Sequence, residues 1–169
     1  AGIPATRAGT FGGAEVRRFC RFPSNVRDGP KKTQAEIAEA IRYVTRGVKS
    51  YVVGGAIGAP IDPGSGEIQG SAPLRTWRGV NIREFLTETT QNRPVFLRND
   101  ADAAALAQLF FGAAAHLPDP SLLFLTCGTG MGLGPIDKGR LLEGTNWAVG
   151  EVAHMTIGGA RHLRPADPL

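Results

Sequence analysis

The sequence has 169 residues, of which 42% are apolar and 20% charged, and its formal net charge is +4 at pH 7. A chain of this size and composition can form one domain with a substantial core, or one domain and part of a second, and it contains no apolar run long enough to cross a membrane. The basic residues are dispersed and no nucleic-acid-binding motif accompanies them, which argues against a nucleic-acid partner.

Two cysteines, Cys20 and Cys127, stand far apart in the sequence. Such a pair does not make a disulfide framework, and Cys127 falls in a stretch that is typical of a buried core. The N-terminus shows no charged-then-apolar secretion pattern. We therefore expect a cytoplasmic protein.

The first half of the chain predicts short strands and two amphipathic helices. Residues 14–22 alternate loosely between apolar and polar and predict a strand. Thr33-Gln34-Ala35-Glu36 fits a capping box, and apolar residues at helical spacing follow it, so we expect a helix over 33–48. Residues 51–59 form an apolar, glycine-rich run typical of a buried parallel strand. A second helix is expected over 80–90.

An extended apolar run over 94–97 leads into the pair Asn99-Asp100, and an alanine-rich helix is expected over 101–115. This helix is apolar on nearly every face, which predicts that it is buried. In open α/β sheets ligands bind where strands end, and a helix N-terminus favours an ionised carboxylate. The pair therefore suits a base that orients a substrate hydroxyl. Both residues are also favoured helix N-caps, so that reading stays open.

The apolar run over 121–126 predicts a central strand, and glycines follow it at alternate positions: Gly128, Gly130, Gly132 and Gly134. A backbone of this kind can bend sharply and expose N–H groups to a phosphate. A dinucleotide motif requires a helix directly after its glycines, whereas an extended segment over 133–136 and a hairpin turn over 137–140 follow here. The dinucleotide reading is rejected, and a phosphate-gripping turn and a plain hairpin remain as alternatives.

Gly150-Glu151-Val152-Ala153-His154 places a carboxylate and an imidazole three residues apart, on one face if the segment is helical. The two side chains could clamp a sugar hydroxyl, supply half of a metal site or form a surface pair. A zinc site needs further ligands, and no cysteine follows. Taken alone, the motif favours a surface pair.

The order of strands and helices predicts an α/β fold with a mostly parallel sheet and flanking helices. Taken together and in order, the motifs resemble the ROK family, the bacterial group of sugar kinases, repressors and related open reading frames. The resemblance covers roughly residues 14–157 and is carried by three segments: Asn99-Asp100-Ala101-Asp102-Ala103-Ala104, Gly128-Thr129-Gly130-Met131-Gly132 and Gly150-Glu151-Val152-Ala153-His154. It implies an actin-like, ribonuclease-H-like fold with the sugar and ATP between two lobes. On that basis we expect an N-terminal sugar-kinase lobe over 1–116 and the start of an incomplete, nucleotide-binding lobe over 117–169.

The resemblance also implies roles for single residues. Asp100 matches the catalytic base, which takes the proton of the sugar hydroxyl that is phosphorylated. Besides Asp100, three residues match the family's hydrogen-bonding partners of the sugar: Asn99, Glu151 and His154. Three others match the loop that meets the ATP phosphates: Gly128, Thr129 and Gly130. Asp102 is expected to cap or line the helix rather than to react.

The expected reaction is transfer of the γ-phosphate of ATP, with Mg²⁺, to a hydroxyl of glucose or an N-acetylhexosamine. Such transfer depends mainly on positioning and on charge stabilisation, which an oriented carboxylate beside a glycine-rich loop can supply. The sequence begins Ala1-Gly2-Ile3-Pro4 where the family has an Asp-x-Gly-Gly-Thr loop, and it stops before most of the second lobe. A catalytically impaired, sugar-binding regulatory or remnant domain is therefore the alternative. Zinc is not expected, because residues 158–169 contain no cysteine, and a homodimer is the hypothesis for assembly.

Overall fold

The computed structural model describes residues 10–11, 14–23, 28–69, 72–128, 130–157 and 161–162. The chain divides into two compact units, Ala1–Leu97 and Arg98–Leu169. The lobes predicted over 1–116 and 117–169 are a different division, which these units do not test, and they stay a prediction. Among the described residues, no helix is long and apolar enough to cross a membrane.

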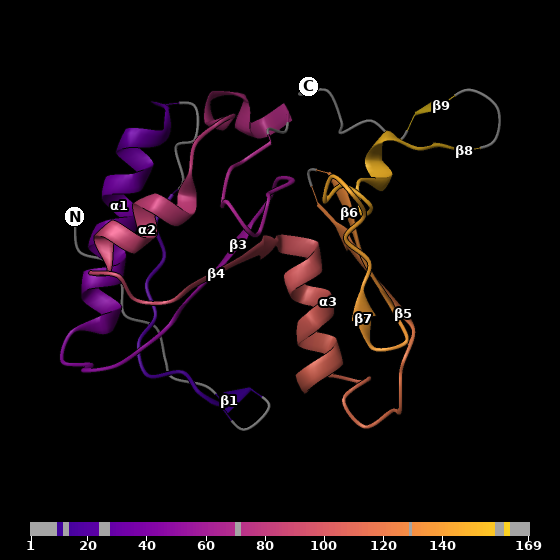
Figure 1. Cartoon of the computed structure of the whole chain (residues 1–169), viewed down its shortest axis with the longest axis horizontal. Helices are drawn as coiled ribbons and strands as arrows, with labels where there is room; N and C mark the ends of the chain where they lie inside the picture. Colours follow the sequence, from indigo (N-terminus) through magenta and orange to yellow (C-terminus); the bar gives the residue numbers. More distant parts are fainter. Residues whose placement is uncertain are drawn as a thin grey trace. The chain divides into compact units, whose positions relative to one another are not determined.

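The elements alternate between helices and short strands along the chain (Figure 1). Up to residue 99 they are β1 (Thr10–Phe11), β2 (Ala14–Glu15), α1 (Pro30–Thr45), β3 (Val53–Ile57), the 3₁₀ helix η2 (Ala72–Trp77), α2 (Ile82–Thr89) and β4 (Val95–Asn99). From residue 100 they are α3 (Asp100–Phe111), β5 (Leu122–Cys127), β6 (Met131–Asp137), β7 (Arg140–Leu141), the 3₁₀ helix η3 (Val152–His154), β8 (Thr156–Ile157) and β9 (Arg161–His162). The fold is therefore mixed α/β, as predicted.

Strands pair with near neighbours in the sequence. β3 lies beside β4, and the Val53 N–H donates to the Pro94 carbonyl at 2.8 Å. β5, β6 and β7 form an antiparallel sheet in that order, and the β5–β6 hairpin closes with Cys127 opposite Met131. The short pairs β1–β2 and β8–β9 are also antiparallel. The predicted strand over 14–22 was wrong beyond Glu15, since residues 16–23 are not extended into a ladder.

Helix α1 begins three residues earlier than the capping box predicts. Its N-cap is Gly29, without a side-chain hydrogen bond, and Pro30 occupies the first helical turn. Proline suits that place because its φ is already helical and the missing N–H would be unpaired there. Thr33 therefore lies inside the helix and is buried instead of capping it. The helix ends at Thr45, close to Gly47 with its φ of +78°, rather than at Val48.

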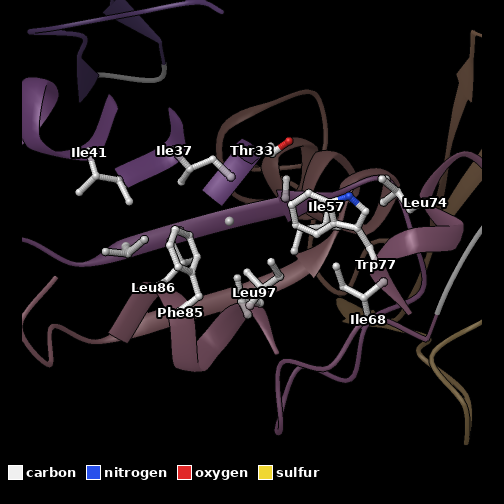
Figure 2. A pocket seen from close by; sticks show the side chains of 16 residues that line it. Thr33, Ile37, Ile41, Ile57, Ile68, Leu74, Trp77, Phe85, Leu86 and Leu97 are labelled. Atoms are coloured by element: carbon white, nitrogen blue, oxygen red, sulfur yellow. The ribbon is translucent and has the colours of Figure 1, made fainter. Parts of the chain in front are cut away.

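The core of the first unit is built from large apolar side chains of α2, β4, η2 and the 59–68 turn: Ala59, Ile61, Ile68, Trp77, Ile82, Leu86, Val95 and Leu97. A cavity of about 600 Å³ opens beside this cluster, between α1, β3 and α2 (Figure 2). Two polar atoms in its lining, Thr33 Oγ1 and Trp77 Nε1, are buried and make no hydrogen bond. This part of the unit is therefore apolar but not filled.

In the second unit, helix α3 packs against β5 and β6. Its buried residues are Ala101 and Ala105, whereas Phe110 and Phe111 are exposed. The helix ends at Phe111 and is covered along one side only, so the predicted buried helix over 101–115 was too long and too enclosed. Strand β5 is also covered on one face only, because alternate side chains along it are exposed. Cys127 is one of these exposed residues, so the prediction that it is buried was wrong.

Candidate active site

The junction of β4 and α3 holds the two residues on which the predicted site depends. Asn99 ends the strand and is the N-cap of α3, with its side-chain Oδ1 accepting from the Ala101 N–H at 2.9 Å and the Asp102 N–H at 3.4 Å. The capping interpretation of Asn99 is therefore correct. Capping uses the carbonyl oxygen of the amide, which is the hydrogen-bond acceptor of this side chain.

Asp100 is the first residue of α3, and its side chain is exposed. Its Oδ1 accepts from the Ala101 N–H at 2.9 Å, which fixes the carboxylate against the start of the helix. The other carboxylate oxygen can accept a hydrogen bond or a proton from a hydroxyl. Asp100 therefore presents an exposed carboxylate at the N-terminus of α3.

The alternating glycines serve two different purposes. A Cβ on Gly134 would overlap the Ala101 carbonyl oxygen and lie 2.6 Å from Ala105 Cβ, and a Cβ on Gly132 would lie 2.9 Å from Thr126 Oγ1. These two glycines allow α3 to lie close against β6. They contribute to the site by placing the first turn of α3, and not by exposing N–H groups.

The other two glycines lie in the turn that connects β5 to β6. The Gly128 N–H donates to the Gly130 carbonyl at 2.9 Å, and nothing lies within 4 Å of where a Cβ would be on either residue. The hairpin itself, with the turn over 137–140 that follows β6, is as predicted. The backbone at Gly128 and Gly130 is accessible to a large anion such as a phosphate chain, and Thr129 lies outside the described residues.

Glu151 follows a glycine that packs directly on β6. The Leu133 N–H donates to the Gly150 carbonyl at 2.9 Å, and a Cβ on Gly150 would overlap the Leu133 carbonyl oxygen. Glu151 is half-buried and is the N-cap of η3, which ends at His154. The motif is thus a single 3₁₀ turn anchored on the sheet, and the side chain of His154 lies outside the described part of the chain.

The pKa of Asp102 is affected by charged groups from several segments of the second unit. Its carboxyl is half-buried, and burial is the largest cause that raises its pKa to about 6. The Glu143 carboxylate raises this pKa further, the Arg98 guanidinium lowers it, and the carboxylates of Asp100 and Glu151 raise it. Asp100 and Glu151, far apart in the sequence, therefore act electrostatically on one side chain.

Sequence reasoning missed two members of this group, Arg98 and Glu143. Arg98 Nε lies 3.6 Å from Glu143 Oε1. Both residues lie in segments that the sequence reasoning singled out, but it gave neither of them a role, and only their opposite charges could have indicated a pair. Among the described residues, no group of three His, Cys, Asp or Glu side chains could hold a metal ion.

Comparison with known proteins gives one family. The model of the ROK family matches residues 19–166. The chain is 34% identical over 141 residues to a glucokinase of Halalkalibacterium halodurans. This alignment covers 80% of this chain and 42% of the glucokinase. It is 35% identical over 85 residues to a xylose repressor of Bacillus spizizenii, and the alignment covers 50% of this chain and 21% of the repressor.

Among solved structures, a ROK hexokinase from Thermus thermophilus is similar, with a TM-score of 0.62 and 34% identity over 89% of this chain and 50% of the hexokinase chain. The fold and the polar strand-to-helix junction define an α/β protein of the actin-like ATPase class. Because the family model matches most of the sequence, the chain belongs to the ROK family. It spans about half the length, or less, of the relatives it matches.

Proposed function

We propose that the chain forms the sugar-binding and proton-accepting part of a carbohydrate kinase of the ROK family. The substrate is a hexose, either glucose or an N-acetylhexosamine, and the donor is ATP with Mg²⁺. The observation that carries the proposal is the β4–α3 junction, where Asn99 caps the helix and Asp100 presents an oriented, exposed carboxylate. The similarity to a glucokinase and a hexokinase supports the same class of reaction.

In this proposal Asp100 is the base. Its carboxylate takes the proton of the acceptor hydroxyl while the hydroxyl oxygen forms a bond to the γ-phosphorus. The bond between that phosphorus and the β–γ bridging oxygen breaks, and ADP leaves with the bonding electrons. General-base catalysis of this kind contributes about 10²- to 10⁴-fold to the rate.

The sugar is held by groups that surround the base. The Asn99 NH₂ donates to one hydroxyl, and the Glu151 carboxylate accepts from another; His154 is assigned to the sugar as well, by its place in the family motif. Glu151 is suited to this because its half-buried side chain starts a turn anchored on β6. Hydrogen bonds from sugar hydroxyls to a carboxylate are stronger than those between neutral groups.

The phosphates of ATP are assigned to the hairpin end, with Gly128, Thr129 and Gly130 as their contacts. Support comes from the open surroundings of Gly128 and Gly130, where a side chain would meet nothing but a ligand would have access to the backbone.

A second candidate is a sugar-binding regulatory domain that does not transfer phosphate. The observation that favours it is the similarity to a xylose repressor, which shows that the chain resembles members of the family that are named for regulation. The two candidates share the sugar contacts and differ in turnover. A binding measurement alone does not separate them.

The test is ADP release from ATP and Mg²⁺ in the presence of a panel of hexoses and N-acetylhexosamines, with the Asp100→Asn variant alongside. We expect one sugar to stimulate turnover and the variant to lose it by at least about 10²-fold. Asp119→Asn is the matched control, because Asp119 is also exposed and its φ of +44° suits asparagine. Unchanged turnover in Asp100→Asn would refute the base, and sugar binding without turnover in the wild type would favour the regulatory domain.

A further inference from the structure

Residues 142–150, which we call the β7–η3 loop, begin and end on the same strand. The Leu142 N–H donates to the Pro135 carbonyl at 2.9 Å, and the Leu133 N–H donates to the Gly150 carbonyl at 2.9 Å. Leu133 and Pro135 are two positions apart on β6, so the two ends of the loop lie close together. A loop of this length whose ends meet in this way is a compact unit.

Contacts within the loop fix the backbone of Glu151, which directly follows it. A Cβ on Gly144, whose φ is +67°, would lie 2.5 Å from Val149 Cγ2, so the first and last parts of the loop touch. The Glu151 N–H donates to the Ala148 carbonyl at 3.2 Å. The place of Glu151 therefore depends on the place of the loop.

An ion pair joins this loop to the end of β4. Arg98 Nε lies 3.6 Å from Glu143 Oε1, and the two side chains are 38% and 33% exposed. An ion pair this exposed adds little to stability. Glu143 Oε1 is buried without a hydrogen bond, which costs free energy and offsets part of that gain. The main effect of the pair is thus to connect the loop with Arg98, the residue directly before Asn99.

We propose that Arg98 and Glu143 are positioning residues that set the spacing between Asn99 and Glu151 in the sugar site. The inference rests on the proposed function, since it assigns a role at the same site. Each member of the pair is close in sequence or by contact to one proposed sugar ligand: Arg98 precedes Asn99, and Glu143 belongs to the loop that carries Glu151. Neither charged side chain needs to touch the sugar for this role.

The ion pair adds what the contacts with β6 do not provide. Helix α3 lies against β6 at Gly134, and Glu151 is held near β6 by Gly150. Contact with one strand leaves each segment free to tilt about that strand, whereas a direct contact between the segments limits the tilt. Hydrogen bonds weaken steeply when distance and angle depart from their optimum, so a looser spacing lowers sugar affinity. Asp100 depends less on the pair, because its carboxylate accepts from the Ala101 N–H.

The first arm of the test measures amide hydrogen exchange of the chain without sugar. Arg98→Gln and Glu143→Gln each remove one charge and are expected to speed exchange of the Glu151 N–H by at least about threefold, because the loop opens more often. Glu143→Gln carries this arm alone if Arg98→Gln does not fold. Lys32→Gln is the matched control, since it breaks the 2.6 Å ion pair with Asp28 in the first unit and should leave this exchange unchanged.

The second arm measures sugar affinity by calorimetry and turnover by ADP release, with glucose and N-acetylglucosamine as the probes. Both glutamine variants are expected to bind sugar about threefold to tenfold more weakly and to raise KM by the same factor, with kcat within about twofold of the wild type. The double variant should lose no more than either single variant, because both changes remove the same contact. Arg98→Lys keeps the charge and is expected to bind within about twofold of the wild type.

The outcomes separate this inference from the proposed function. Unchanged exchange of the Glu151 N–H in both glutamine variants would overturn the connection between loop and strand, whether or not a sugar binds. Faster exchange with unchanged affinity, or losses that add up in the double variant, would overturn the positioning role while leaving the proposed function intact. An Arg98→Lys variant that binds as weakly as Arg98→Gln would show that the charge is not the cause. Absence of sugar binding by the wild type would overturn the proposed function and, with it, the positioning role.

Discussion

The two units of the chain differ in how their own side chains are packed. The first unit buries large side chains such as Ile61, Ile68 and Leu97, and still has an open cavity of about 600 Å³ beside them. The second unit has small residues at its tightest contacts, where Ala101 and Ala105 meet Gly134. Its polar side chains gather around the first turn of α3. One unit is thus loosely filled and apolar, and the other is closely packed with charges at its edge.

This difference has a functional consequence. Small residues let two backbones approach, and the side chains at the ends of those segments are then brought together without filling the space between them. The β4–α3 junction and the turn before η3 are both anchored on β6 in this manner, by Gly134 and by Gly150. Substitutions in the core of the first unit should therefore change stability alone, whereas substitutions at Gly134 and Gly150 in the second should affect stability and sugar binding together.

The largest stability effect is expected in the core of the first unit. Leu97→Ala removes a side chain that is 1% exposed and should lower the free energy of unfolding by about 3 kcal/mol. Leu123→Ala, at a position that is 71% exposed, should change it by less than about 0.5 kcal/mol. Urea denaturation of both variants measures the contrast, and equal losses would show that the burial assigned to Leu97 is wrong.

Close packing in the second unit can be tested with alanine in place of glycine. Gly134→Ala places a methyl group against the Ala101 carbonyl and Ala105, and should cost about 2 kcal/mol of stability through overpacking. Gly128→Ala is the matched variant, because its Cβ would meet nothing within 4 Å, and it should leave the free energy of unfolding nearly unchanged. Denaturation curves that do not separate the two variants would contradict the role given to Gly134.

The raised pKa of Asp102 predicts that the stability of the chain depends on pH. The folded-state pKa of Asp102, about 6, lies above its ordinary value of 3.8, so the protonated form is favoured by folding. This contribution is fully present below pH 4 and is lost as the pH rises through 6. Asp102→Asn cannot ionise, so the variant should not lose this stability and should be about 1 kcal/mol more stable than the wild type at pH 7.5. This figure is smaller than the full pKa shift implies, because the carboxyl is partly solvated. Thermal unfolding at pH 5 and 7.5 tests the sign, and a less stable variant at pH 7.5 would contradict it.

The smallest effect concerns the cavity. Thr33 Oγ1 is buried beside it without a hydrogen bond, which costs free energy. Thr33→Val keeps the shape of the side chain and should raise the free energy of unfolding by up to about 1 kcal/mol. A melting temperature that falls in this variant would show that the hydroxyl has a partner in solution.

The sequence predicted the junction better than it predicted burial. The Asn99-Asp100 pair, the hairpin after residue 121 and the turn at Asp137-Arg140 follow from local chemistry, because caps and turns need particular residues at particular places. Burial depends on which surfaces meet, and an apolar run does not reveal whether one face or two are covered. For that reason Cys127 and the end of α3 were placed in a core where the structure leaves them exposed.

The start of α1 and the ion pair of Arg98 and Glu143 show two further limits. Thr33 fits a capping pattern, but Pro30 starts the helix before it, since a proline is better suited to the first turn than to any interior position. Arg98 and Glu143 lie in different segments and their types and spacing indicate no pairing, so only the folded chain shows that they are 3.6 Å apart. Long-range charge pairs of this kind cannot be read from spacing.

The central claim is that Asp100 accepts a proton from the sugar, whereas Glu151 holds the sugar. The most direct test measures sugar affinity by calorimetry and turnover by ADP release on the same preparations of the wild type, Asp100→Asn and Glu151→Ala. We expect Asp100→Asn to bind sugar within about threefold of the wild type but to lose turnover, and Glu151→Ala to lose at least about tenfold in affinity. Turnover that survives in Asp100→Asn, or unchanged affinity in Glu151→Ala, would contradict it.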